Sequence, residues 1–155
     1  MLNWQGGSVN ATTVNTYNAR DQIKLVRQYQ GDEGSATYQD TTVTYDGYGR
    51  LKTKHVPQQQ VDPNNSSSTD HTTWTYNDDD TTASITDARG ASQTFTYNNR
   101  RLVAGLTYSA PSGIPVPASV SFSYDAAGNR KAMTDGFGTV NYTYNQLSAL
   151  AAHFH

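Results

Sequence analysis

Large and small side chains alternate along several short stretches of the chain, and each stretch ends at a tyrosine. An aromatic residue or valine precedes threonine or serine, then tyrosine, then Asp or Asn, as at 43–46, 74–77, 95–98, 122–125 and 142–145, with a weaker copy at 15–18. Alternation with a period of two predicts strands that have one aromatic face. The pattern therefore predicts an all-β chain that repeats one structural unit.

An Asp-x-x-Gly segment follows several of these strands. Asp accepts backbone N–H bonds at the first position of a type I turn, and Gly takes the left-handed position that follows at low steric cost. This combination is a common β-hairpin connection with a bulge. It is predicted at four places: Asp46 with Gly49, Asp87 with Gly90, Asp125 with Gly128, and Asp135 with Gly138.

Some turns depart from this pattern. The turns that begin at Asn18, Asn77 and Asn98 have Asp or Arg at the left-handed position. Because Asp tolerates that conformation modestly and Arg poorly, these turns are expected to be looser or a residue longer. The last unit, 144–155, has no glycine after Asn145 and is expected to be incomplete, without a return strand.

Two stretches interrupt the spacing of the repeats. Residues 57–73 are polar with two early prolines, and residues 109–118 contain three prolines, whose missing N–H groups keep them out of a central strand. Both are predicted to be long hairpin tips rather than domain linkers. The repeats run roughly from residue 14 to residue 147, so residues 1–155 are expected to form a single domain.

Composition excludes several classes of protein. The chain contains 11 tyrosines, 21 threonines and one glutamate, and strand and turn residues replace the strong helix formers, which excludes a helical bundle. A net charge of -2 without a basic cluster argues against nucleic-acid binding. No apolar run approaches a membrane span, and the first residues lack the pattern of a signal peptide. The absence of cysteine excludes a disulfide scaffold and thiol catalysis.

Few residues suggest chemistry. Asp78, Asp79 and Asp80 lack the spacing of a calcium loop and are interpreted as a polar turn. His153 and His155 offer two metal ligands without a third. The serines at 66–68, near Asp70 and His71, provide triad residue types in one flexible loop, whereas a triad needs a rigid nucleophile. No catalytic residue, metal or cofactor is expected, and a glycoside hydrolase built on distant aspartates is a remote alternative.

The aromatic rows allow two interpretations. Exposed rings flanked by Asn, Asp and Gln could stack on a sugar, and the candidates for such a site are Trp74, Tyr76, Tyr97 and Tyr124. Rings on neighbouring strands could instead stack on one another and stabilise the sheet. The regular recurrence favours the structural interpretation, because a binding site does not need a copy on every hairpin.

Two heptapeptides carry a family resemblance. Residues 45–51 (Tyr-Asp-Gly-Tyr-Gly-Arg-Leu) and 124–130 (Tyr-Asp-Ala-Ala-Gly-Asn-Arg) resemble the tyrosine–aspartate (YD) repeat of rearrangement-hotspot (RHS) proteins, bacterial toxin-complex shells and teneurins. The resemblance implies a long antiparallel sheet that spirals into a hollow shell, with tyrosines stacked in stripes. The residues that match the repeat motif are Tyr17, Tyr45, Asp46, Gly49, Tyr76, Asn77, Asp87, Gly90, Tyr97, Asn98, Tyr124, Asp125, Gly128, Asp135, Gly138 and Tyr144.

The resemblance also implies a function. At two strands per unit, the chain is expected to form a curved sheet of about twelve strands. The resemblance implies that this sheet is a non-enzymatic fragment of a larger secreted or cell-surface bacterial protein. Such a shell encapsulates a toxin or presents a surface outside the cell. The expected partners are neighbouring repeats of the parent chain or a second copy bound through the sheet edges. A carbohydrate- or cell-surface-binding module, with a glycan as partner, is the alternative.

Overall fold

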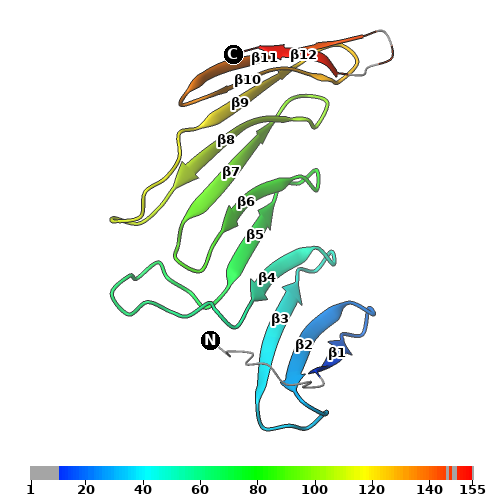
Figure 1. Ribbon diagram of the computed structural model, residues 1–155, viewed down its shortest axis with the longest axis vertical. Helices are drawn as coiled ribbons and strands as arrows, with labels where there is room; N and C mark the ends of the chain where they lie inside the picture. The colour runs from blue at the N-terminus through cyan, green and yellow to red at the C-terminus, as the bar shows by residue number, and fades with distance from the viewer. Residues whose placement is uncertain (1–10, 146, 148–149, 155) are drawn as a thin grey trace.

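The described part of the chain folds as one antiparallel β-sheet. The computed structural model describes residues 11–145, 147 and 150–154. These residues form twelve strands and no helix, and each strand pairs with the next in chain order (Figure 1). The predicted all-β sheet of repeated hairpins is confirmed. The strands are β1 (Ala11–Tyr17), β2 (Ile23–Gln30), β3 (Tyr38–Tyr45), β4 (Leu51–His55), β5 (Thr72–Tyr76), β6 (Thr82–Thr86), β7 (Ser92–Tyr97), β8 (Val103–Ser109), β9 (Val120–Tyr124), β10 (Arg130–Asp135), β11 (Gly138–Tyr144) and β12 (Leu150–Phe154).

Connections alternate between two sides of the sheet. The turns that follow the tyrosines lie along one side, on the right in Figure 1, and we call this side the turn edge. The remaining connections lie along the opposite side, which we call the loop edge. A repeat hairpin is defined here as a strand that ends at a tyrosine, its turn and the return strand. The turn edge therefore gathers equivalent residues from hairpins that are distant in sequence.

The sheet is a single layer without a conventional core. Among the described residues, only Ala88 and Val140 are buried, at 7% and 8% exposure, and no polar residue is buried. A sheet without a covering layer cannot gain its stability from a central apolar core. Contacts between neighbouring hairpins must supply it, as they do in other repeat proteins.

The two faces of the sheet differ in chemistry. On the ring face, three aromatic residues that lie two places before a tyrosine pair with apolar residues of the return strand, in Trp74–Ile85, Phe95–Leu106 and Phe122–Met133. On the opposite hydroxyl face, small polar residues pair, with side-chain oxygens 2.5 Å apart in Thr44–Thr53 and 2.6 Å apart in Thr75–Ser84. The alternation in the sequence thus predicts which face each side chain occupies.

The predicted bulge occurs in the hairpins of Asp46 and Asp125, and the other repeat hairpins have one as well, whereas the strands on either side of the Asp87 turn pair without a register shift. The register shifts by one residue where each strand reaches its tyrosine, so the return strand has one extra residue without a partner at that point. A bulge increases the local right-handed twist, and its repetition curves the sheet. The shifts occur next to Tyr17, Tyr45, Tyr76, Tyr97, Tyr124 and Tyr144.

The prediction that turns without glycine are looser or longer is wrong. Asp21, Asp80 and Arg101 adopt the left-handed conformation, with φ of 56°, 67° and 60°. The N–H of Arg101 donates to the carbonyl of Asn98 at 2.9 Å, which matches the 3.0 Å bond from Gly49 to Asp46 in a glycine turn. The Oδ1 of Asn98 also accepts from two backbone N–H groups, at 2.9 and 3.1 Å. These bonds hold Arg101 in a conformation that it would otherwise avoid.

Two further predictions about hairpins are wrong. Asp135 and Gly138 pair directly across a two-residue connection, without the predicted four-residue bulged turn, because the pairing of β10 with β11 continues to its last residues. The last unit does have a return strand, since β12 pairs with β11 and Leu150 lies opposite Tyr144. The N–H of Leu147 donates to Oδ1 of Asn145, as the equivalent N–H does in other turns.

The loop before β5 is a strap rather than a free tip. It runs from the end of β4 to Thr72 and folds over the turn between β6 and β7. The Ala88 carbonyl accepts from the Thr69 N–H at 2.8 Å and from the Ser68 hydroxyl at 3.0 Å, and the Asn65 amide donates to the Arg89 carbonyl at 2.8 Å. These bonds cover Ala88, one of the two buried residues.

Three glycine-to-alanine variants should separate backbone strain from crowding. Gly128 has φ of 93° and no neighbour closer than 3.9 Å to an added Cβ, so Gly128→Ala should lower the free energy of unfolding by about 1 kcal/mol. Gly90 has φ of 83°, and a Cβ there would lie 2.7 Å from the Cβ of Ser67. Gly90→Ala should therefore cost about 2 kcal/mol or more.

Urea unfolding measures these changes, with Gly47→Ala as the matched control. Gly47 lies in a repeat turn without a positive φ, and an added Cβ there meets nothing within 4 Å. The free energy of unfolding of the Gly47→Ala variant should differ from that of wild type by less than about 0.5 kcal/mol. Equal losses for Gly90→Ala and Gly128→Ala would contradict the close contact between the strap and the turn.

Candidate functional site

The repeat tyrosines connect successive hairpins along the turn edge. The hydroxyl of Tyr45 donates to the carbonyl of Ile23 at 2.9 Å, and Ile23 is the residue that pairs with the preceding repeat tyrosine, Tyr17. The same relation recurs at three more junctions, with distances of 2.7 to 2.9 Å: Tyr76 to Leu51, Tyr97 to Thr82, and Tyr124 to Val103. Each tyrosine therefore reaches from its own strand to the adjacent return strand of the hairpin before it.

The predicted stacking of the repeat tyrosines on one another is wrong. Among the described residues, the one pair of rings in contact is Tyr29 and Tyr38, whose centroids lie 6.0 Å apart. Successive repeat tyrosines are two strands apart, about 9.6 Å, whereas stacked rings lie within about 7 Å of each other. A phenol ring is long enough to span one strand spacing, so its hydroxyl meets a carbonyl instead of a second ring.

Burial favours the protonated form of two of these hydroxyls, those of Tyr76 and Tyr97. Desolvation raises the pKa of Tyr76, and the Asp46 carboxylate raises it further. Desolvation also raises the pKa of Tyr97, with a further contribution from Asp79. A phenol with a raised pKa stays a hydrogen-bond donor throughout the physiological range of pH.

Arginines add a second set of links between turns. At the third position of the first turn, Arg20 donates to the carbonyl of Gly47 at 3.0 Å, and Gln22 donates to the carbonyl of Gly49 at 2.8 Å. Arg100 has the same position in the fourth turn and donates to the carbonyl of Ala126 at 2.8 Å. An arginine at this position thus binds the second carbonyl of the turn that follows.

The middle turns are linked by ion pairs. Arg50 contacts Asp46 of its own turn at 2.7 Å and Asp80 of the next turn at 2.6 Å, and its guanidinium lies 4.4 Å from the centre of the Tyr76 ring. Arg101 lies 3.5 Å from Asp79 in the turn before it. Side chains therefore connect all four junctions between the first five turns. The residues 11–145 contain no group of three or more His, Asp or Glu side chains that could hold a metal ion.

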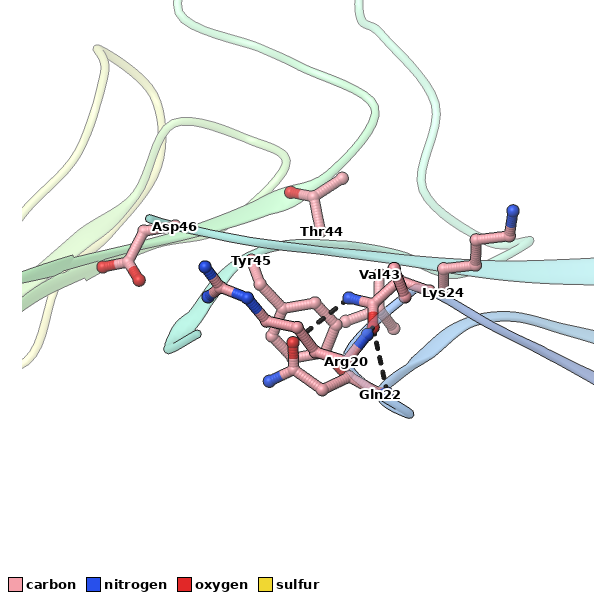
Figure 2. Close-up of a pocket in the computed structure, with 9 residues that line it drawn as sticks. Arg20, Gln22, Lys24, Val43, Thr44, Tyr45 and Asp46 are labelled. Atoms are coloured by element: carbon pink, nitrogen blue, oxygen red, sulfur yellow. Dashed lines mark hydrogen bonds between the residues drawn. The ribbon is translucent and has the colours of Figure 1, made fainter. Parts of the chain in front are cut away.

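A shallow crevice lies between the first two turns. It has a volume of about 360 Å³ and is lined by Asn18, Arg20, Gln22, Tyr45 and other residues of the two hairpins. Figure 2 shows Arg20 and Gln22 beside the Tyr45 ring, with Lys24 pointing away from it. Arg20 and Gln22 already donate to the next turn, so the polar groups of the crevice serve the junction.

The equivalent crevice between the third and fourth turns has different chemistry. It is lined by Asp78, Asp79, Phe95, Tyr97 and their neighbours, so acidic residues replace the basic ones of the first crevice. The two crevices share their position and their tyrosine but not their charge. The repeated feature is therefore the junction, not a ligand site of constant chemistry.

The residues proposed for ligand stacking lie on the ring face. Trp74, Tyr76, Tyr97 and Tyr124 are all half-buried. The three tyrosine hydroxyls are bonded within the sheet. The hydroxyls of these three tyrosines are thus used by the fold.

The motif residues are divided between the two edges. The turns that begin at Asp46, Asn77, Asn98 and Asp125 lie together on the turn edge, whereas those at Asp87 and Asp135 lie on the loop edge. Sequence reasoning missed the linking role of the arginines. Their recurrence at the third to fifth positions of the turns is the signal that could have found them: Arg20, Arg50, Arg100 and Arg101.

The triad-type residues Ser68, Asp70 and His71 make contacts within and beside the strap. The Ser68 hydroxyl donates to the Ala88 carbonyl and accepts from the N–H of Asp62. Nδ1 of His71 lies 2.6 Å from Asp70, which lowers the pKa of that carboxyl. His153 and His155 lie, respectively, in β12 and outside the described residues.

Comparison with known proteins identifies the fold. No protein-family model and no curated protein sequence matches the chain. The solved structure of TcdB2-TccC3-TEV superposes with a TM-score of 0.72 over 92% of this chain at 17% identity, and TcdB2-TccC3-Cdc42 with 0.71 over 97% at 17% identity. A Photorhabdus luminescens Tc holotoxin pore with TccC3-D651A gives 0.68 over 91% at 16% identity. The chain has the YD-repeat fold. It spans only 7–8% of the length of each of these matched chains.

Removal of one tyrosine hydroxyl should weaken a YD junction. Tyr76→Phe keeps the ring but removes the donor to the Leu51 carbonyl, so the free energy of unfolding should fall by about 1 kcal/mol. Urea unfolding measures the change. Tyr48→Phe is the control, because Tyr48 is 85% exposed on a turn. Equal stability of Tyr76→Phe and wild type would refute the hydroxyl link.

The stability of the YD sheet should fall in acid. Bonds from the side chain and backbone of Asn129 lower the pKa of Asp125, and the Arg27 side chain lowers that of Asp40. A carboxyl with a lowered pKa stabilises the fold fully above its unfolded pKa, about 3.9, and loses this contribution as pH falls below that value. Unfolding in urea at a series of pH values should show a loss that begins near pH 4.

Asp125→Asn separates this effect from general acid sensitivity. Asn98 has the equivalent turn position and accepts the same backbone bonds, so the variant should fold. The difference in unfolding free energy between wild type and variant should be largest at pH 7 and shrink in acid. A difference that stays constant with pH would contradict the contribution of Asp125.

Proposed function

We propose that this chain is a structural wall segment of a larger RHS-type protein on the bacterial exterior, and that it has no catalytic role. The observation that supports this proposal is the use of the repeat residues. The hydroxyls of Tyr45, Tyr76, Tyr97 and Tyr124 all join one hairpin to the hairpin before it. A residue that recurs because each junction needs it serves the assembly of the sheet rather than a single site.

The acidic groups support a structural role as well. Asp40 pairs with Arg27, Asp46 with Arg50, and Asp87 with Arg89, at 2.6 to 2.7 Å. A general acid or base needs a carboxyl whose pKa is shifted toward neutrality. The shifts of Asp40 and Asp46 are downward, which suits ion pairs and turn bonds.

The shape of the sheet suits a wall. A single layer with two accessible faces can separate an interior from an exterior, but one open sheet encloses nothing by itself. Encapsulation of a toxin, or presentation of a surface, would therefore require the remaining repeats of a larger protein. The fold similarity to toxin-complex structures supports this assignment and an extracellular location. No helix in the described part of the chain is long and apolar enough to cross a membrane.

A glycan array combined with melting experiments tests the wall role against carbohydrate binding. The wild-type chain should bind no glycan. Tyr97→Ala should lower the free energy of unfolding by about 2 kcal/mol or more, because it removes a half-buried ring and a hydroxyl link. Tyr48→Ala, at an 85% exposed position, is the control and should melt close to wild type. Glycan binding that is lost in Trp74→Ala without a change in melting would overturn the wall role.

A further inference from the structure

One pocket belongs to a loop that interrupts the repeats. It has a volume of about 290 Å³ and is lined by residues of β6, β7 and β8 and by residues 114–117 of the loop that joins β8 to β9 at the loop edge (Figure 1). The two crevices described above lie between turns of the turn edge and are lined by residues of the repeat hairpins. This loop-edge pocket uses an insertion instead, so the repeated junctions do not account for it.

Three neighbouring strands supply one side of the loop-edge pocket. Ile85 pairs with Gln93, and Gln93 pairs with Tyr108, so the three side chains form a row across the sheet. The row lies on the ring face, because Ile85 also pairs with Trp74. All three side chains line the pocket and are half-buried. The sheet therefore fixes an aliphatic group, an amide and a phenol side by side.

Two polar groups in this row are not used by the fold. Gln93 lies four places before the repeat tyrosine Tyr97, at the position that Val120 and Val140 occupy in the next two repeat hairpins. Within the described part of the chain, neither the Gln93 amide nor the Tyr108 hydroxyl has a hydrogen-bond partner. A side-chain amide provides both donors and an acceptor. The pocket thus presents hydrogen-bonding groups beside an apolar surface.

The loop supplies an apolar and rigid second side. Residues 114–117 read Ile-Pro-Val-Pro, and each proline fixes its own φ angle. The N–H of Ile114 donates to the carbonyl of Pro111 at 3.2 Å, which closes a turn at the start of the loop. Pro111 lies against the turn between β6 and β7, since a Cβ on Gly90 would be 3.1 Å from its Cγ. The pocket is therefore formed before any ligand arrives.

The lining residues indicate the chemistry of a ligand. Asp87 and Arg89 are the two charged residues of the pocket, and they neutralise each other at 2.7 Å. A charged ligand would be repelled by one of them, so a neutral ligand is favoured. The flat ring of Tyr108 and the loop prolines suit a second flat ring, and the Gln93 amide suits a group that both donates and accepts. The volume lies at the lower end of small-molecule pockets, which begin at about 300 Å³.

We propose that the loop-edge pocket binds a small, neutral aromatic compound with an amide-like edge, whose ring lies between Tyr108 and residues 114–117 and whose edge bonds to the Gln93 amide. This inference goes beyond the wall role and does not depend on it. None of the residues that line the pocket gives or accepts a tyrosine link between hairpins.

Titration with benzamide, followed by ¹H–¹⁵N NMR spectra of the whole chain, tests the pocket. The amide signals of the residues that line it should shift and saturate, with a dissociation constant of about 1 mM. Benzoate is the matched control ligand, because it keeps the ring but replaces the neutral amide by a carboxylate that cannot donate. Benzoate should bind about 10-fold more weakly or not at all. Equal binding of the two compounds would contradict the amide edge.

Gln93→Val tests the polar contact. Valine occupies the equivalent position at Val120 and Val140, so the variant should fold. Its dissociation constant for benzamide should rise about 2- to 10-fold, the effect of a lost hydrogen bond. The control is Gln39→Val, which makes the same change on β3, where Gln39 pairs with Gln28 away from the pocket. This control should bind benzamide like wild type.

Val116→Ser tests the apolar side. Val116 is 46% exposed, so the variant should melt close to wild type, while its affinity for benzamide should fall about 3-fold. Val61→Ser is the control, at a 57% exposed position of the strap outside the pocket. Absence of saturable shifts at the pocket, or unchanged affinity in both Gln93→Val and Val116→Ser, would overturn the proposal. Neither result would affect the wall role, which the glycan array and Tyr97→Ala test separately.

Discussion

The bond from a tyrosine hydroxyl to a carbonyl of the neighbouring hairpin is the interaction on which this sheet depends. The sheet has one layer, and among its described residues only Ala88 and Val140 are buried. Stability must therefore come from contacts between adjacent strands. The tyrosine adds to the backbone ladder because its ring covers the neighbouring strand while its hydroxyl bonds to that strand's backbone.

The two edges of the sheet reinforce this interaction in different ways. On the turn edge, arginines reach from one turn to the next, and Arg50 joins two turns while it covers the ring of Tyr76. On the loop edge, the strap binds the carbonyl of Ala88 and packs against Gly90. Both devices act between hairpins.

Several local features could be predicted from the sequence, and the reason is that short-range rules govern them. Asp46 with Gly49 and Asp125 with Gly128 form the predicted turns, because carboxylate bonds and the left-handed glycine act within five residues. Arg101 shows where these rules fail. Its conformation is unfavourable alone, but the bonds to Asn98 hold it, so a turn without glycine has the same length.

The sequence by itself determined the repeated hairpin, its bulge and the face on which each ring lies. The tertiary structure alone decided what the rings and arginines bind. The hydroxyl of Tyr97 meets the carbonyl of Thr82, and Arg20 meets the carbonyl of Gly47. A backbone carbonyl carries no side-chain signature, and its position depends on the register between strands and on the curvature of the whole sheet. The expected stacking of tyrosines was wrong because it ignored the spacing between strands. One strand spacing lets the hydroxyl reach a carbonyl, whereas the next repeat tyrosine lies two strand spacings away, too far for its ring to be stacked.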